Sequence, residues 1–98
     1  RLDEAKEILA YLNMKSGRSF ESLPANTELI SARLNDGASR EQCLLVIDRK
    51  VAEWGNDPGM AKYIRPVTIF NRTKFANYVG ALNVPAAGVT SLVKRAAI

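Results

Sequence analysis

Apolar residues recur at steps of three and four along much of the chain, and this spacing predicts amphipathic helices. The first predicted helix runs from Leu2 to about Asn13. Gly17 is expected to end it, because glycine readily adopts the left-handed conformation that follows many helices. The segment 18–24 reads as a loop, with Phe20 and Leu23 expected to anchor it to the core. The apolar stripe of the helix consists of Leu2, Ala5, Ile8, Leu9 and Leu12.

A second helix is predicted from Thr27 to Asn35. Asn26 is a suitable N-cap, and Gly37 is expected to lie near the end. The apolar face of this helix would be formed by Ile30 and Leu34, with Leu29 beside them.

The third helix has the clearest signal in the chain. Ser39 and Gln42 form an S-x-x-Q capping box, in which each residue satisfies a backbone N–H of the first turn. Gly55 is expected to end the helix. Its apolar stripe consists of Cys43, Leu44, Ile47, Val51 and Trp54.

The second half of the chain predicts shorter elements. Asp57 and Pro58 favour a cap followed by a short turn over 59–64. The residue before a proline disfavours helix, so Arg65 marks a break, and Pro66 can start another short turn through Phe70. A last helix is predicted over Lys74–Leu82, capped by Thr73, with Phe75, Tyr78, Val79 and Leu82 on one face.

Together these elements predict an all-α domain, a compact bundle of about four to five short helices over residues 1–83. The only run that favours a strand, 67–70, is opened by a proline. Residues 84–98 form an Ala/Val-rich tail that is expected to be flexible or to form a short helix, with one or two amphipathic turns over 90–98. Isolated helices of that length are marginal in water.

The 98 residues suffice for one domain with a single core. The chain begins with Arg1 rather than Met, so we expect it to be a piece of a longer protein with its partner domains upstream. With 47% hydrophobic and 24% charged residues, the composition is that of a soluble globule. No apolar run approaches the roughly 18 residues of a membrane span, so we expect no membrane partner. The lone Cys43 is compatible with a cytoplasmic location.

The net charge of +4 is unevenly distributed. Residues 1–32 carry slightly more acidic than basic side chains, whereas residues 58–98 contain no acidic residue. This asymmetry favours contact between the second half and a polyanion or an acidic protein surface. A solvated basic surface without a partner is the alternative. The basic residues of the second half are Lys62, Arg65, Arg72, Lys74, Lys94 and Arg95.

The residue types needed for catalysis are scarce. There is no histidine, so the commonest general base and metal ligand is missing. One cysteine cannot form a zinc site, and Cys43 lies on an apolar stripe that favours burial. Neither a phosphate-binding nor a dinucleotide-binding glycine motif is present. We therefore expect a non-catalytic protein without metal or cofactor.

Basic and aromatic residues alternate between residues 49 and 78, a combination that can hold phosphates and stack on bases. Aromatic residues at helical spacing are more often part of a core, which is the expectation for Trp54, Phe70 and Phe75. The candidate nucleic-acid-binding residues are Arg49, Lys50, Lys62, Tyr63, Arg65, Arg72, Lys74 and Tyr78. With about four to six phosphate contacts, binding would be weak and sensitive to salt.

The strings ILAYLNMKSGRSF, LISARLNDG, VIDRKVAEWGNDPGMAKYIRPVTIF and TKFANYV occur in an order that resembles the conserved phage C-terminal domain of replisome-organiser and replication-initiation proteins. The resemblance covers roughly residues 8–79, and the stretch 63–70 is its most specific part. The chain is also distantly similar to the second domain of the primosome protein DnaD. The tail beyond Val79 departs from the pattern, because Ala and Val replace the charged ending of the family.

The resemblance implies a module that follows an upstream DNA-binding domain and acts in the cytoplasm of a bacterial host. It would bind single-stranded DNA, or recruit the host replicative helicase or its loader, or do both. By the similarity to DnaD, the residues of interest are Lys62, Tyr63, Ile64 and Arg65. Two alternatives stay open: a protein-interaction adaptor without nucleic-acid contact, and a self-association module that forms a homo-oligomer.

Overall fold

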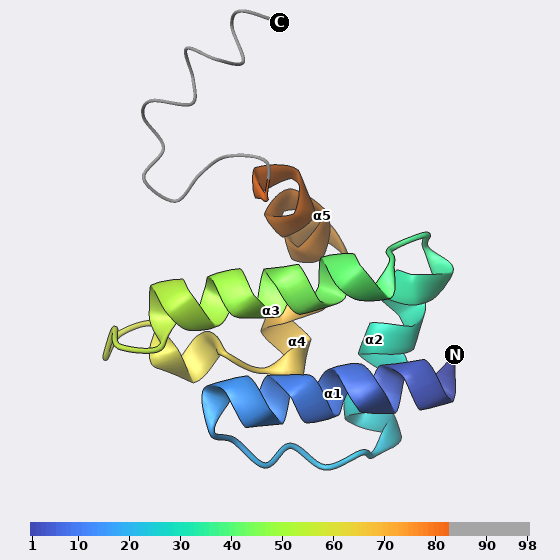
Figure 1. The fold of residues 1–98 in the computed structure, drawn as a ribbon, viewed down its shortest axis with the longest axis horizontal. Helices are drawn as coiled ribbons and strands as arrows, with labels where there is room; N and C mark the ends of the chain where they lie inside the picture. The colour runs from blue at the N-terminus through green and yellow to red at the C-terminus, as the bar shows by residue number, and fades with distance from the viewer. Residues whose placement is uncertain (83–98) are drawn as a thin grey trace, which may run out of the picture.

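Helices make up almost all regular structure in the part of the chain that the computed structural model describes, residues 1–82 (Figure 1). There is no strand in that range, so the predicted all-α class is confirmed. The predicted tail, with its expected turns over 90–98, lies outside the described residues. The elements are α1 (Leu2–Ser16), α2 (Pro24–Asn35), α3 (Arg40–Trp54), a 3-10 turn η1 (Ala61–Tyr63), α4 (Pro66–Ile69) and α5 (Arg72–Ala81).

The two longest helices, α1 and α3, lie side by side and run in the same direction (Figure 1). Polar contacts along the pair fix this register. Glu7 pairs with Arg40 near one end, and the Tyr11 hydroxyl donates to Asp48 over 2.6 Å further along. Helix α2 packs against α1, and α5 stands across α3 on the side away from α1 (Figure 1). The short α4 lies between α3 and α2 and connects the bundle to α5.

The core is formed where the predicted apolar stripes meet. All but one residue of the predicted α1 stripe are buried; the exception is Leu2, the first residue of α1, which is 51% exposed. Phe70 is fully buried and stacks on Phe75, with ring centroids 5.5 Å apart. The run 67–70 forms the end of α4, not a strand. The largest fully buried side chains include Ile8, Leu9, Leu12, Ile30, Leu34, Val46, Ile47, Ile69 and Phe70.

Several predicted helix ends are confirmed. Gly17 adopts the left-handed conformation, with φ 72°, after α1. Ser39 and Gln42 form both hydrogen bonds of the capping box, each 3.0 Å long. Gly55 follows the last residue of α3, and Arg65 is extended immediately before Pro66 begins α4.

Two predicted caps are wrong. Helix α2 begins at Pro24, one turn before the predicted start, because a proline at the first helical position loses no hydrogen bond and has φ already set. Asn26 is therefore a residue of the first turn of the helix and not its cap, and its side-chain amide donates to the carbonyl of Glu21. Helix α5 begins at Arg72, and its cap is Asn71, whose side chain accepts the Lys74 N–H over 2.9 Å, so Thr73 lies within the first turn.

Of the two residues predicted to anchor the loop before α2 to the core, Phe20 and Leu23, only Phe20 does so. Asn13 accepts the Phe20 N–H and donates to the Phe20 carbonyl, both over 2.9 Å, and this pair fixes the half-buried Phe20 against the bundle. Leu23 is 54% exposed, so its predicted anchoring role is wrong. It occupies the N-cap position of α2 in an extended conformation, which directs the side chain away from the core.

One charged side chain is buried at the junction of α2 and α4. The side chain of Arg33 is only 10% exposed. Its Nη1 donates to the Phe70 carbonyl over 2.7 Å, and its Nε donates to Asp36 over 3.0 Å. A buried guanidinium is stable only with such partners, so Arg33 couples the end of α2 to the start of α5.

Replacing Arg33 with Met should lower the free energy of unfolding by about 2–4 kcal/mol, because the substitution leaves the buried Phe70 carbonyl without its donor. Urea unfolding followed by circular dichroism measures this change. Arg40→Met is the matched control: both partners of the Arg40–Glu7 pair are more than half exposed, so its effect should stay within about 0.5 kcal/mol. Equal effects of the two substitutions would contradict the role of Arg33.

Cys43 should be almost inert in the folded chain. Burial raises the pKa of its thiol to about 12, and the Glu4 carboxylate contributes to the rise. Since alkylation needs the thiolate, iodoacetamide at about pH 8 should modify the native chain at least a hundredfold more slowly than the urea-unfolded chain. Mass spectrometry measures both rates. The raised pKa also links the Cys43 thiol to the free energy of unfolding. Because the thiol loses its proton more easily in the unfolded chain, its ionisation leaves the free energy of unfolding unaffected below about pH 9 and lowers it as the pH approaches 12. Comparable alkylation rates would refute the burial of this thiol.

Candidate functional site

Five of the eight predicted binding residues meet where the C-terminal end of α3, η1 and α5 come together. Together with Trp54 they form what we term the basic–aromatic cluster. Its members come from segments distant in the sequence, so the fold and not the chain order creates the site. The cluster consists of Lys50, Trp54, Lys62, Tyr63, Arg65 and Tyr78.

Trp54 lies at the centre of the cluster. Its ring meets Tyr63 edge-on at a centroid distance of 6.5 Å and Tyr78 edge-on at 6.1 Å. Such perpendicular contacts between rings are favourable because the positive edge of one ring faces the negative face of the other. Trp54 is half-buried and packs against the core, so the expectation that it is a core residue is confirmed only in part.

Lys50 holds the inner part of the cluster together. Its ammonium lies 4.2 Å from the centroid of the Tyr78 ring and 5.0 Å from that of Trp54, and Glu53 pairs with it over 2.8 Å. Its side chain is only 12% exposed. This ammonium thus already has partners inside the protein, and the structure gives Lys50 a structural role at the contact of α3 with α5.

Tyr78 stays a neutral phenol under ordinary conditions. Burial raises the pKa of its hydroxyl, and the Glu53 carboxylate contributes to the rise. A neutral ring keeps the electron-rich face that attracts the Lys50 ammonium.

The outer part of the cluster is the segment from Lys62 to Arg65. Ile64 is buried and fixes the segment to the core, while Lys62 and Arg65 are exposed. The Lys62 ammonium lies 5.3 Å and the Arg65 guanidinium carbon 5.4 Å from the centroid of the half-buried Tyr63 ring. Arg65 also donates from Nε to the Thr68 hydroxyl over 3.0 Å. Two cations and one aromatic ring are thereby presented together at the surface.

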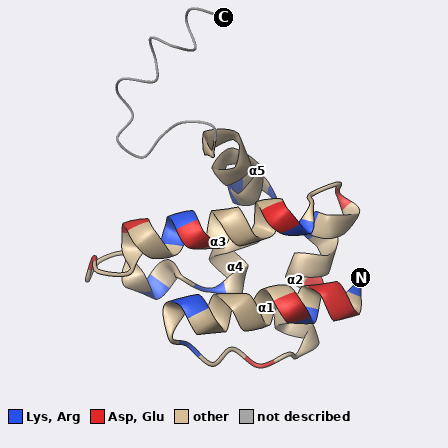
Figure 2. Cartoon of the chain, viewed as in Figure 1, with Lys and Arg blue, Asp and Glu red and all other residues tan. Residues whose placement is uncertain are grey.

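A basic residue that sequence reasoning did not identify lies beside this segment. Arg18, in the loop after α1, donates from Nη2 to the Ala61 carbonyl over 2.9 Å. Lysine and arginine residues from the end of α1, the loop after it and η1 lie at one end of the molecule, opposite the acidic first turn of α1 (Figure 2). No local pattern connects Arg18 with η1, because 43 positions separate the two bonded residues.

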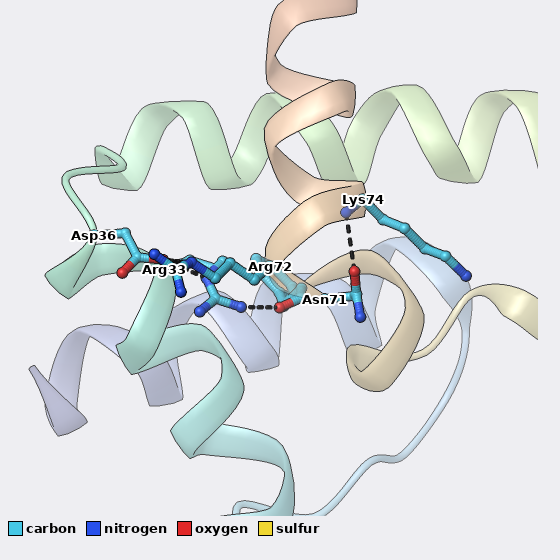
Figure 3. A network of polar contacts seen from close by, with 6 residues as sticks. Arg33, Asp36, Asn71, Arg72 and Lys74 are labelled. Atoms are coloured by element: carbon cyan, nitrogen blue, oxygen red, sulfur yellow. Dashed lines mark hydrogen bonds and ion pairs between the residues drawn. The ribbon is translucent and has the colours of Figure 1, made fainter.

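The remaining three predicted residues lie elsewhere. Arg72 and Lys74 are two positions apart on α5, so they project from opposite sides of the helix. Arg72 extends toward Asp36, with 4.0 Å between Nε and Oδ2, whereas Lys74 points away from that pair (Figure 3). Lys74 shares its helix face with Tyr78 and so lies on the side of the basic–aromatic cluster. Arg49 donates to the Ala81 carbonyl over 3.4 Å at the other end of α5.

The basic–aromatic cluster presents cations beside aromatic rings, a combination suited to binding an anionic partner. Among residues 1–82 no group of three or more His, Cys, Asp or Glu side chains is placed to hold a metal ion. Within the same range no helix has the length and apolar character needed to cross a bilayer. The exposed heads of Lys62 and Arg65 can contact phosphates, and Tyr63 between them in sequence can stack on an unpaired base.

The family comparison covers most of the chain. Residues 8–80 match the family model described as conserved phage C-terminus, which agrees with the resemblance read from the sequence strings. The match includes α2, α3, η1, α4 and all members of the basic–aromatic cluster. No curated protein and no solved structure matches the chain.

The contact between Lys50 and Tyr78 should be measurable as a coupling energy. In a double-mutant cycle of Lys50→Met and Tyr78→Leu, we expect a coupling of about 1–2 kcal/mol in the free energy of unfolding, because the ammonium is largely desolvated. The exposed pair Lys62→Met and Tyr63→Leu serves as the control and should couple by about 0.5 kcal/mol or less. Urea unfolding measures both cycles. A coupling at Lys50 no larger than the control would refute its structural role.

Proposed function

We propose that this chain, which belongs to the conserved phage C-terminus family, is a non-catalytic module of a phage replication-initiation protein that binds single-stranded DNA in the cytoplasm of the bacterial host. The family membership supplies the phage context. The DNA-binding part of the proposal is supported by one observation above all, the exposed Lys62 and Arg65 heads within 5.4 Å of the half-buried Tyr63 ring.

Single-stranded DNA suits this surface better than a duplex. A ring can stack on a base only where the base is unpaired, and the two flanking cations can then hold the adjacent phosphates. The exposed cations Lys62 and Arg65 lie on η1 and at the start of α4, and these elements, with three and four residues, are too short to fill a major groove. Lys74 and Arg18 extend the basic surface on two sides of the cluster.

The small number of cations limits the affinity. Lys50 is already paired and nearly buried, so about four phosphate contacts are available, from Arg18, Lys62, Arg65 and Lys74. Binding should therefore be weak alone and strongly dependent on salt. Such a module would strengthen an origin-binding domain on the same protein by raising the local concentration of its site.

Recruitment of the replicative helicase or its loader, self-association, and the more distant similarity to DnaD stay predictions from the sequence resemblance. A pull-down of the host helicase and its loader, together with light scattering of the chain over a range of concentrations, would test the first two.

The double substitution Lys62→Ala and Arg65→Ala should weaken binding to a fluorescent oligothymidine by about ten- to a hundredfold at low salt. It should also reduce the slope of log affinity against log salt by about two, because two phosphate contacts are lost. Fluorescence anisotropy measures both. The matched control is Lys6→Ala with Arg40→Ala, which removes the same charge from exposed positions on α1 and α3 away from the cluster.

Two outcomes would count against the proposal. The first is an unsubstituted chain that does not bind the oligothymidine at low salt. The second is equal weakening by the two double substitutions, since this would mean that net charge and not the cluster drives the binding. A duplex of the same length should compete poorly for the site.

A further inference from the structure

A separate groove lies on the opposite face of α5, between that helix and the turn that joins α2 to α3. It is a hollow of about 460 Å³. We term it the Arg72 groove; its lining includes Arg33, Asp36, Ala38, Arg72, Ala76 and Val79. None of them belongs to the basic–aromatic cluster, so the groove is independent of the proposed DNA-binding function.

We propose that the Arg72 groove binds an acidic, amphipathic segment of another protein. The apolar side chains of that segment would lie on the α5 wall, and one carboxylate would pair with Arg72. Three properties of the groove favour this partner: an excess cation at its rim, an apolar wall, and small residues that leave room for an incoming side chain.

The excess cation is Arg72. The Asp36 carboxylate is shared between two arginines, with Arg33 Nε at 3.0 Å and Arg72 Nε at 4.0 Å from the same oxygen (Figure 3). Arg33 takes the close contact and is nine-tenths buried, whereas the Arg72 side chain is 82% exposed. Two guanidinium groups thus face one carboxylate. Arg72 is the more distant of the two, so a carboxylate from a partner can approach it more closely than Asp36 does and form a stronger ion pair.

The apolar wall is one face of α5. Arg72, Phe75, Ala76 and Val79 recur at the spacing of adjacent turns, so they share that face. Ala76 is exposed and Val79 is half-buried, which leaves apolar surface accessible beside the cation. Across the hollow, Gly37 and Ala38 have little or no side chain. Small residues therefore stand on both sides of the hollow, Ala76 on α5 and Gly37 and Ala38 across from it, and leave room for a leucine-sized side chain.

The composition of the groove favours a protein segment over nucleic acid. The groove offers one largely exposed cation, Arg72, beside an apolar wall, which suits a single carboxylate among apolar side chains better than a run of phosphates. Phe75 is only 4% exposed, so the groove presents no ring on which a base could stack. An acidic helix with apolar residues at steps of three and four would satisfy both the wall and Arg72, as in other helix-in-groove complexes.

The test uses the whole chain and a designed probe, a short helical peptide with a stripe of leucines and with aspartates flanking that stripe, so that one carboxylate can reach Arg72. We expect it to shift the amide NMR signals of Gly37, Ala38 and Ala76, and to leave those of Lys62 and Arg65 unchanged. Arg72→Gln and Ala76→Gln should each weaken binding about tenfold or more. Both positions are exposed, so both variants should fold. Asn77→Gln, an exposed position of α5 outside the groove lining, is the matched control and should bind as the unsubstituted chain does.

Two further peptides test separately whether binding needs the apolar side chains and whether it needs the carboxylates. A peptide with serine in place of leucine, and one with lysine in place of aspartate, should each fail to shift the groove signals. The proposal is overturned if the acidic peptide shifts none of these signals, if the lysine peptide binds equally well, or if oligothymidine shifts them and the acidic peptide does not. The last outcome would assign the groove to nucleic acid.

Discussion

The point at which α5 leaves the bundle depends on a buried cation, Arg33. Arg33 donates to the Phe70 carbonyl at the end of α4, and the polypeptide turns there to begin α5. A guanidinium removed from water is unfavourable without partners, so the structure is stable only when this carbonyl and Asp36 lie where Arg33 can reach both. The hydrophobic effect brings the helices together without fixing their orientation. The directional hydrogen bonds of Arg33 fix where α5 leaves the bundle.

Helix α5 in turn separates two surfaces of different chemistry. Its Tyr78 and Lys74 face the end of α3 and the aromatic side chains there, while Arg72, Ala76 and Val79 face the turn after α2. A rotation of α5 by one residue, about 100°, would disrupt both surfaces. Because Asn71 caps the helix and Arg33 holds the preceding carbonyl, that rotation is prevented at the first turn. One small helix can therefore present two independent surfaces in a domain of this size.

Much of this fold follows from local pattern. The steps of three and four in α1 and α3, the capping box at Ser39 and the extended Arg65 before Pro66 are short-range features, and each is present in the structure. The errors at Asn26 and Thr73 are local too, because in each case a nearby residue is better suited to the start of the helix. Leu23 shows the other limit: an apolar residue beside a helix need not be buried when its backbone conformation directs it outward.

The site could be predicted only in part, since its contacts are long-range. Alternation of basic and aromatic residues identified Lys62, Tyr63, Arg65 and Tyr78, which the fold brings together. Nothing in the sequence indicated that Lys50 would be nearly buried, that Arg72 would lie beside Asp36, or that Arg18 would bond to η1.

The nearly buried Lys50 has a consequence for binding. Trp54 is held by Lys50 and Tyr78, and Trp54 in turn contacts Tyr63, so the ring that would meet a base is already ordered before any ligand arrives. Ordering a side chain on binding costs about 0.5–1.5 kcal/mol, and here folding has largely met that cost. Lys50, which contacts no phosphate itself, can thus raise the affinity of the Tyr63 ring for a base. Removal of the Lys50 ammonium would weaken DNA binding without changing the number of counterions released. Loss of Lys62 or Arg65 would change both the affinity and the number of counterions released. The salt dependence of affinity therefore separates the residues that contact DNA from those that hold the contacting residues in place.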